Sequence, residues 1–272
     1  MTKKGFTTDF LIPCLVLLLG TMLFRMTDLD MRLAGLFYSR TRGWFLEDAW
    51  IIEFLHRLGA SPALIACFFA LCAIGGGFRS QRLSGYRKSA FYCLLVFAIG
   101  SGLVVNLLLK QHWGRPRPNQ IVAFGGDKSY LPVWVKGDCP TCRSFPCGDA
   151  SAGFFFLFLF FALRRRSPRA AAWFLLMGIA YGSLLGLCRM ARGAHFASDV
   201  MWGGGIMYMS SAVFYYALGL HLERHRRREL RRHFVPQGRP VTTIPRVAGN
   251  QTTLQQNTGL SFSPAERPSP VS

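Results

Sequence analysis

Four side chains suited to phosphate chemistry lie within the twelve residues from Cys188 to Asp199. Arg189 and Arg192 carry the positive charge that holds an anion. His195 offers an imidazole nucleophile, and Asp199 offers a carboxylate to orient it. Because Asp199 follows His195 by four residues, a helix that starts here places the carboxylate one turn from the ring. The pattern predicts phosphoryl transfer through a phosphohistidine.

The segment 110–118 adds more positive charge. Its Lys110 and Arg117, together with Arg189, would neutralise the charge that spreads over the equatorial oxygens of a phosphoryl group in the transition state. None of these parts needs a metal ion or a cofactor, and the sequence offers no carboxylate cluster to hold a metal. We therefore expect a site without metal or cofactor.

A third polar segment, 145–151, precedes a run rich in phenylalanine and is expected to open a helix. Gly148 lets the backbone approach a ligand closely, and the free N–H groups of a helix N-terminus attract anions. We therefore place Gly148 among the phosphate-binding residues.

The composition is that of a membrane protein. Apolar residues make up 51% of the 272 residues, and the run Phe154 to Phe161 is too apolar for a helix exposed to water. The net charge of +19 raises the question of nucleic-acid binding. However, the basic residues lie in short clusters between apolar runs and in the C-terminal tail, which is typical of the cytoplasmic loops of a membrane protein.

The apolar runs predict an all-α, polytopic membrane protein with six transmembrane helices in a bundle. The region before the second span, 25–57, suits short helices at the membrane interface. The membrane domain covers residues 1–221, and residues 222–272 are expected to form a basic and then disordered cytoplasmic tail. The predicted spans are about 10–24, 58–78, 89–109, 150–163, 170–187 and 200–220.

The distribution of basic residues predicts the orientation. With the N-terminus inside, the inner segments hold 19 Lys and Arg against 4 Asp and Glu, while the outer segments hold 13 against 9. The positive-inside rule favours this arrangement. The three polar segments then meet on the extracytoplasmic face, where they form an active-site loop region.

These motifs resemble those of the type 2 phosphatidic acid phosphatase (PAP2) superfamily. Lys110 to Pro118 matches K-x6-R-P, and Arg189 to Asp199 matches R-x5-H-x3-D. Between them, Pro146 to Asp149 stands where the family has P-S-G-H. The resemblance implies a membrane phosphatase with His195 as the nucleophile, and it covers the chain from the third to the sixth span.

The middle motif departs from the family. Asp149 stands where a His would protonate the leaving oxygen, and Cys147 replaces a Ser that would contact phosphate. Asp149 is an acid whose pKa is raised towards neutrality, an anchor for Arg115 or Arg192, or the mark of a substrate whose leaving group needs little protonation, such as a diphosphate or a sugar phosphate. His112 is an alternative acid, although a loop residue is its simpler interpretation. We place Asp149 with the catalytic residues and Cys147 with the phosphate-binding ones.

We interpret the chain as an integral-membrane lipid phosphatase of the inner (plasma) membrane. The substrate is a phosphorylated lipid, with lipid A phosphate first because the segments 124–127 and 139–144 and the acidic residue at 149 are similar to those of lipid A phosphatases. Prenyl diphosphate, phosphatidylglycerol phosphate and phosphatidate are the other candidates, and nucleic acid is not a partner. Two alternatives stay open: a lipid phosphotransferase with a prenyl diphosphate donor, and a non-catalytic lipid-binding or transport protein.

The cysteines do not form a zinc pattern, since Cys139-x-x-Cys142 has no second pair. On an extracytoplasmic face these two cysteines are expected to enter a disulfide. The sequence does not identify the partners, and a bond between Cys147 and Cys188 is an alternative pairing.

Overall fold

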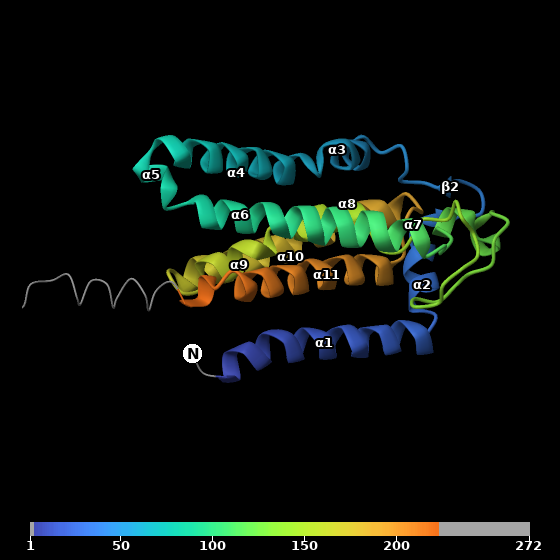
Figure 1. The fold of residues 1–272 in the computed structure, drawn as a ribbon. Helices are drawn as coiled ribbons and strands as arrows, with labels where there is room; N and C mark the ends of the chain where they lie inside the picture. The colour runs from blue at the N-terminus through green and yellow to red at the C-terminus, as the bar shows by residue number, and fades with distance from the viewer. Residues whose placement is uncertain (1–2, 223–272) are drawn as a thin grey trace, which may run out of the picture. The chain divides into compact units, whose positions relative to one another are not determined.

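The computed structural model describes residues 3–222, and the predicted tail lies almost wholly outside them. These residues belong to one compact unit of the chain. Helices dominate (Figure 1), as the sequence predicted. The main helices are α1 (Lys3–Met26), α2 (Leu29–Gly35), α3 (Trp50–Leu58), α4 (Ser61–Arg79), α5 (Gln81–Ser84), α6 (Arg87–Leu95), a π-helical stretch η1 (Val96–Leu109), α7 (Lys110–His112), α8 (Gly148–Phe154), α9 (Leu157–Leu163), α10 (Pro168–Ala191) and α11 (Ala197–Ala217).

The remaining elements are short. A two-stranded antiparallel hairpin pairs β1 (Tyr38–Ser39) with β2 (Gly43–Trp44), and it interrupts the region for which the sequence predicted only short helices. Three 3-10 turns complete the set: η2 (Pro118–Gln120), η3 (Val122–Phe124) and η4 (Leu220–Leu222).

Each of the six apolar runs is helical, but the lengths differ from the predicted ones. Four helical segments of residues 3–222 are long and apolar enough to cross a membrane. The predicted fourth span is the shorter pair α8 and α9, and the predicted sixth span, α11, is not among the four. The four segments are Gly5–Met26, Trp50–Arg79, Arg87–His112 and Pro168–Ala191.

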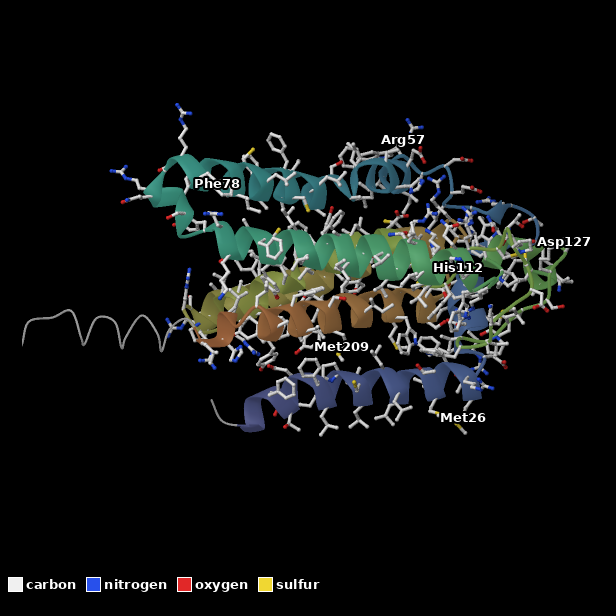
Figure 2. All side chains as sticks on the ribbon, viewed as in Figure 1. Met26, Arg57, Phe78, His112, Asp127 and Met209 are labelled. Atoms are coloured by element: carbon white, nitrogen blue, oxygen red, sulfur yellow. A yellow bond between two sulfur atoms is a disulfide. The ribbon has the colours of Figure 1, made fainter. Side chains whose placement is uncertain are left out.

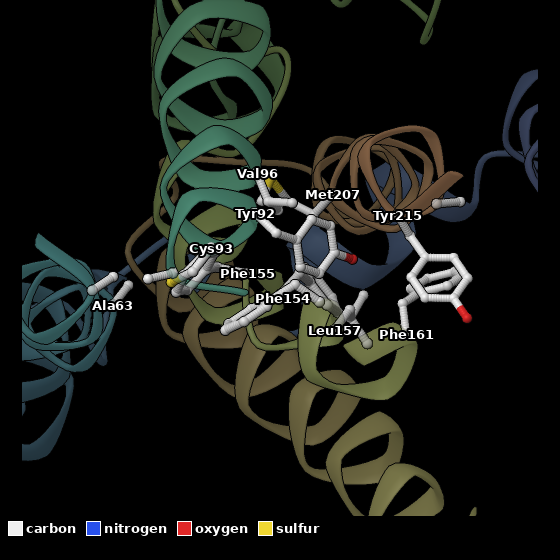
Figure 3. Close-up of a cluster of buried hydrophobic side chains, with 14 of the residues drawn as sticks. Ala63, Tyr92, Cys93, Val96, Phe154, Phe155, Leu157, Phe161, Met207 and Tyr215 are labelled. Carbon is white, nitrogen blue, oxygen red and sulfur yellow. The ribbon is translucent and has the colours of Figure 1, made fainter. Parts of the chain in front are cut away.

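The core lies around α8 and α9, which pack against α10, α11 and η1. Figure 3 shows the aromatic and aliphatic side chains that meet there, among them Phe154, Phe155 and Met207. Two glycines allow the close approach of α8 and α10, because a Cβ on Gly153 would lie 2.7 Å from the Cα of Gly182. The apolar side chains of α1 and α4 that face away from this core are exposed, as expected where lipid replaces water.

Polar side chains lie at both ends of the helices, and they are most numerous at the end that carries the long loops. Figure 2 shows nitrogen and oxygen atoms around the end at which Arg57, His112 and Asp127 are labelled, whereas carbon dominates around Met209. This end contains α2, α3, α7 and the loop that joins α7 to α8 (Figure 1). The fold therefore brings the three polar segments of the sequence to the same end.

A small aromatic cluster supports the chain just before α11. Gly193 has a φ of +62°, and the Trp44 indole occupies the space that a Cβ would fill, 2.3 Å from that position. Trp44 also packs against the buried side chains of Ile121 and Phe196. The hairpin thus fixes the turn that precedes His195.

One disulfide forms a tight turn within the loop before α8. It joins Cys139 to Cys142, with the two Cα atoms 5.3 Å apart. Cys147 and Cys188 are both free and buried, so the alternative bond between them is not formed.

Candidate active site

His195 lies in the short loop between α10 and α11 and is fully buried. Its Nδ1 is 3.7 Å from Oδ2 of Asp199, and neither ring nitrogen has a hydrogen-bond partner among the described residues. Burial lowers the pKa of His195, with Asp199 acting in the opposite direction and Lys110 and Arg189 adding to the lowering. The imidazole is therefore neutral near pH 7, which is the form that can act as a nucleophile.

Asp199 lies in the first turn of α11, and three donors hold its carboxylate. Oδ1 accepts from Arg115 Nη1 at 2.5 Å, whereas Oδ2 accepts from the Ser144 hydroxyl at 2.6 Å and from the Phe196 backbone N–H at 2.8 Å. A carboxylate with this many donors stays charged although it is buried. Asp199 is therefore a fixed negative charge beside His195.

Arg115 is the centre of a buried network that sequence reasoning missed. Its guanidinium is fully buried and bonds Asp30 Oδ2 at 2.9 Å, in addition to Asp199. Asp30 comes from α2, and its Oδ1 accepts from the backbone N–H of Ser198 at 2.9 Å. Tyr130 also donates to Asp30, at 3.3 Å. The sequence suggested Asp149 as an anchor for Arg115, but the carboxylates that bind Arg115 are Asp30 and Asp199.

Lys110 and Gly148 meet where η1 ends and α8 begins. A Cβ on Gly148 would lie 3.2 Å from Lys110 Nζ and 2.4 Å from the side-chain oxygen of Asn106. A side chain at position 148 would therefore push both groups away. Asn106 is another residue that the motif search did not single out, and it donates to the carbonyl of Ser101 at 2.8 Å.

Cys147 precedes α8 and is fully buried. Burial raises the pKa of its thiol to about 12, so the group stays neutral near pH 7. Its backbone N–H donates to the carbonyl of Asp199 at 3.1 Å, which ties α8 to α11. The backbone N–H of Cys147 thus already has a hydrogen-bond acceptor within the protein.

Arg117 is anchored through its backbone, which donates to the Gln120 side chain at 2.9 Å. Its guanidinium is within electrostatic range of Arg189, Asp149 and Cys147. The structure therefore brings both ends of the K-x6-R-P motif close to the residues of the other two motifs.

Asp149 and Arg189 form an ion pair, with Nε 2.8 Å from Oδ2. The sequence suggested Arg115 or Arg192 as the partner of Asp149, and both choices were wrong. Arg192 pairs instead with Glu53 of α3. An ion pair uses the carboxylate form of Asp149, whereas a proton donor must be the carboxylic acid.

A further residue that the sequence reading missed is His56 of α3. Its Nδ1 is 3.7 Å from Oδ2 of Asp149 and 2.9 Å from Nη1 of Arg189. Nothing in the local sequence marks this histidine as a site residue. Only its position in the fold, beside Asp149 of the altered motif, identifies it as one. The alternative acid, His112, is exposed and contacts the carbonyl of Leu108 in the preceding turn, at the end of η1.

Residues 3–222 contain no group of three or more His, Cys, Asp or Glu side chains placed to hold a metal ion. What the site does contain is a buried imidazole beside a carboxylate, with Lys110 and Arg189 within electrostatic range of the ring and Arg117 within range of Arg189. This arrangement can hold a phosphate and attack it.

Comparison with known proteins gives a consistent picture. The chain is 38% identical to the Lipid A 4'-phosphatase of Francisella tularensis subsp. novicida over 191 residues, which is 69% of this chain and 85% of the relative. It is also 36% identical to the Lipid A 4'-phosphatase of Rhizobium leguminosarum over 158 residues, 57% of this chain and 61% of the relative. No solved structure matches the chain. The model of the PAP2 superfamily matches residues 91–222, so the chain belongs to this superfamily.

Proposed function

We propose that the chain is an integral-membrane lipid phosphatase that removes a phosphate from lipid A or a closely similar lipid. The observation that carries the proposal is the buried His195, whose ring nitrogens have no described partner and which lies beside Asp199. The substrate class follows from the similar proteins, which are lipid A 4'-phosphatases. These names favour hydrolysis over phosphotransfer and over a purely lipid-binding role.

In the proposed mechanism, Lys110, Arg117 and Arg189 bind the phosphate oxygens. The lone pair of His195 attacks phosphorus and the ester bond breaks, which gives a phosphohistidine. Asp199 stabilises the positive charge that develops on the ring, as the aspartate of a catalytic triad does. Water then cleaves the phosphohistidine and releases inorganic phosphate. The phosphate-binding set also includes the start of α8 at Cys147 and Gly148, which stays a prediction from the motif.

We assign Asp149 to the anchoring of Arg189. Its ion pair at 2.8 Å holds the guanidinium in place for the phosphate. This role corresponds to the anchoring alternative that the sequence left open, with a different arginine as the partner.

We further propose that the helices cross the inner membrane six times, with α8–α9 as a short fourth span and α11 as the sixth. The site then lies on the periplasmic face, and the arginines of 79–88 and 164–169 lie in the cytoplasm. Cysteine accessibility tests this placement: with Cys14, Cys67 and Cys72 changed to Ser in one background, a membrane-impermeant maleimide applied to intact cells should label Lys128→Cys and leave Arg166→Cys unlabelled.

The proposed reaction needs no metal ion, because Lys110, Arg117 and Arg189 supply the positive charge that stabilises the transition state. Phosphate release in the presence of EDTA should therefore equal that in its absence. A loss that added Mg²⁺ or Zn²⁺ restores would show that a metal takes part.

The activity is tested with purified protein in detergent, by measuring phosphate released from lipid A, phosphatidate, phosphatidylglycerol phosphate and undecaprenyl diphosphate. Wild type should act most rapidly on lipid A, and His195→Ala should release no phosphate. Cys93→Ala, a buried substitution outside the site, is the matched control for folding. Full activity of His195→Ala would overturn the mechanism, and no release from any of the lipids by wild type would overturn the proposed function.

A further inference from the structure

The proposed mechanism lacks a proton donor for the leaving oxygen. The family motif has a histidine at position 149, and this chain has an aspartate there. An alkoxide leaving group needs a proton as the ester bond breaks, and a positioned acid contributes roughly 100- to 10,000-fold to such a step. We infer that His56, which α3 places against Asp149 and Arg189, is this proton donor; the inference rests on the proposed function.

Three contacts fix the position of His56. On the same face of α3, three residues earlier, Glu53 pairs with Arg192 at the end of α10. Just beyond α3, the carbonyl of Gly59 accepts from the Tyr181 hydroxyl of α10 at 2.7 Å. Between these two attachments, Nδ1 of His56 lies 2.9 Å from Nη1 of Arg189. The face of α3 that carries His56 is thus attached to the helix that carries the phosphate-binding arginine.

Close packing of the two helices adds to this attachment. Gly59 has no side chain where a Cβ would lie 2.5 Å from a methyl carbon of Leu185 in α10. A larger residue at position 59 would force α3 away from α10, and His56 with it. The position of the imidazole therefore depends on the backbone as well as on the ion pairs.

The environment of His56 suits a group that exchanges protons. Its side chain is 34% exposed, so that a proton can be regained from water after each turnover. In the free protein, burial lowers the pKa of His56 and Arg189 and Arg192 add to the lowering, whereas Asp149 and Glu53 favour the protonated ring. A phosphate bound to Arg189 would neutralise one of the opposing charges. Binding of the substrate thus favours the form that donates.

The atoms balance through both steps. As the P–O ester bond breaks, its electron pair goes to the leaving oxygen, which takes a proton from the His56 imidazolium and departs as an alcohol. The neutral His56 then takes a proton from water while the water oxygen attacks phosphorus. The P–N bond breaks, its electrons return to His195, and inorganic phosphate leaves. His56 is protonated again at the end of the cycle.

The arrangement explains how Asp149 fits a motif that has a histidine in the family. Asp149 cannot donate the proton while it pairs with Arg189, but its Oδ2 lies 3.7 Å from Nδ1 of His56. The carboxylate thus lies beside both the guanidinium and an imidazole that a distant part of the sequence supplies, and these two groups also contact each other. In this proposal Asp149 is a positioning residue for His56.

The test compares two substrates that differ in one atom. The first is lipid A with its natural 4'-phosphate oxygen ester, and the second is the same lipid with sulfur in the bridging position. A thiolate leaves without a proton, so the sulfur ester does not need an acid. His56→Ala and His56→Gln should lose about 100-fold or more in kcat on the oxygen ester and less than about 5-fold on the sulfur ester. His112→Ala, a histidine at the same end of the molecule, should match wild type on both substrates.

Each outcome decides a different point. An equal loss of kcat on both esters, or activity retained by His56→Gln, would show that His56 has only a structural role. Trapping the phosphoenzyme with ³²P-labelled substrate provides a second measurement, since the His56 variants should form it slowly from the oxygen ester and normally from the sulfur ester. If wild type cleaves neither ester, the proposed function fails rather than the assignment of His56.

Discussion

Two histidine–aspartate pairs lie near Arg189, and in both the Nδ1-to-carboxylate distance is 3.7 Å. In the first pair the side chains of His195 and Asp199 are 0% exposed. In the second, those of His56 and Asp149 are 34% and 38% exposed. The same chemical pair therefore occurs once in a fully buried environment and once in a partly solvated one.

The difference in burial suits two different tasks. A nucleophile must be neutral and fixed, and burial lowers the pKa of His195 while the network around Asp199 holds the carboxylate. A proton donor must exchange with water, and the exposed position of His56 allows this exchange. The supports differ as well. Asp199 has donors from three separate segments, whereas Asp149 relies on Arg189 and His56.

The largest effect is expected from neutralising the aspartate of the buried pair. Asp199→Asn should lower kcat by about 10,000-fold, because an amide cannot stabilise the imidazolium that forms at His195 and can hold the wrong tautomer. Phosphate release from lipid A at substrate saturation measures the effect. A loss below about 10-fold would show that Asp199 serves only to bind Arg115.

The next largest effect is on the free energy of unfolding. It compares the loss of a buried ion-pair network with the loss of a partly exposed ion pair. Arg115→Ala leaves Asp30 and Asp199 buried without their cation, which should cost about 3–5 kcal/mol of the free energy of unfolding. Arg192→Ala removes a partly exposed pair with Glu53 and should lower the free energy of unfolding much less.

Denaturant unfolding in detergent, followed by tryptophan fluorescence, measures the two variants. Arg115→Met is the informative companion, because it keeps the volume and loses the charge. Equal stability of the Arg115 and Arg192 variants would contradict the role given to burial.

The same contrast explains what could be predicted from the sequence. Long apolar runs must be helical where they are buried or meet lipid, so the helices were found although their ends were not. His195 and Asp199 are close in sequence and lie at the start of a helix, so their pairing follows from spacing alone. The buried pair was therefore visible in the motif.

The partners that were missed are distant in sequence. His56 lies 133 residues from Arg189, and Asp30 lies 168 residues from Ser198. No local pattern marks either residue, because each acquires its partners only when α2 and α3 pack against the ends of α10 and α11. The wrong partners predicted for Asp149 have the same origin. By sequence alone, Arg115, Arg189 and Arg192 are equally good ion-pair partners, and only the packing of the helices selects Arg189.

A smaller effect should follow from neutralising the aspartate of the exposed pair. Asp149→Asn should lower kcat about 10-fold, because a partly solvated ion pair contributes about 1 kcal/mol. If Asp149 acts mainly through His56, Asp149→Asn should slow the His56→Ala enzyme far less than about 10-fold, and the remaining loss should come from the anchoring of Arg189. Multiplicative losses would show that the two residues act separately, and a loss in Asp149→Asn as large as that of His56→Ala would return Asp149 to the role of proton donor.

The smallest expected effect is a shift of the pH profile. The pKa of His195 lies below its usual 6.5, so the low-pH limb of kcat/KM should lie below pH 6.5, where protonation removes the nucleophile. The charged groups that face His195 are Asp199, Lys110 and Arg189, and of these only Asp199 raises its pKa.

Asp199→Asn should therefore move the low-pH limb of kcat/KM to still lower pH, although the variant turns over much more slowly than wild type. Asp149→Asn, whose carboxylate contacts the other histidine, should leave the limb in place. A shift of the low-pH limb in Asp149→Asn and not in Asp199→Asn would exchange the roles of the two histidines.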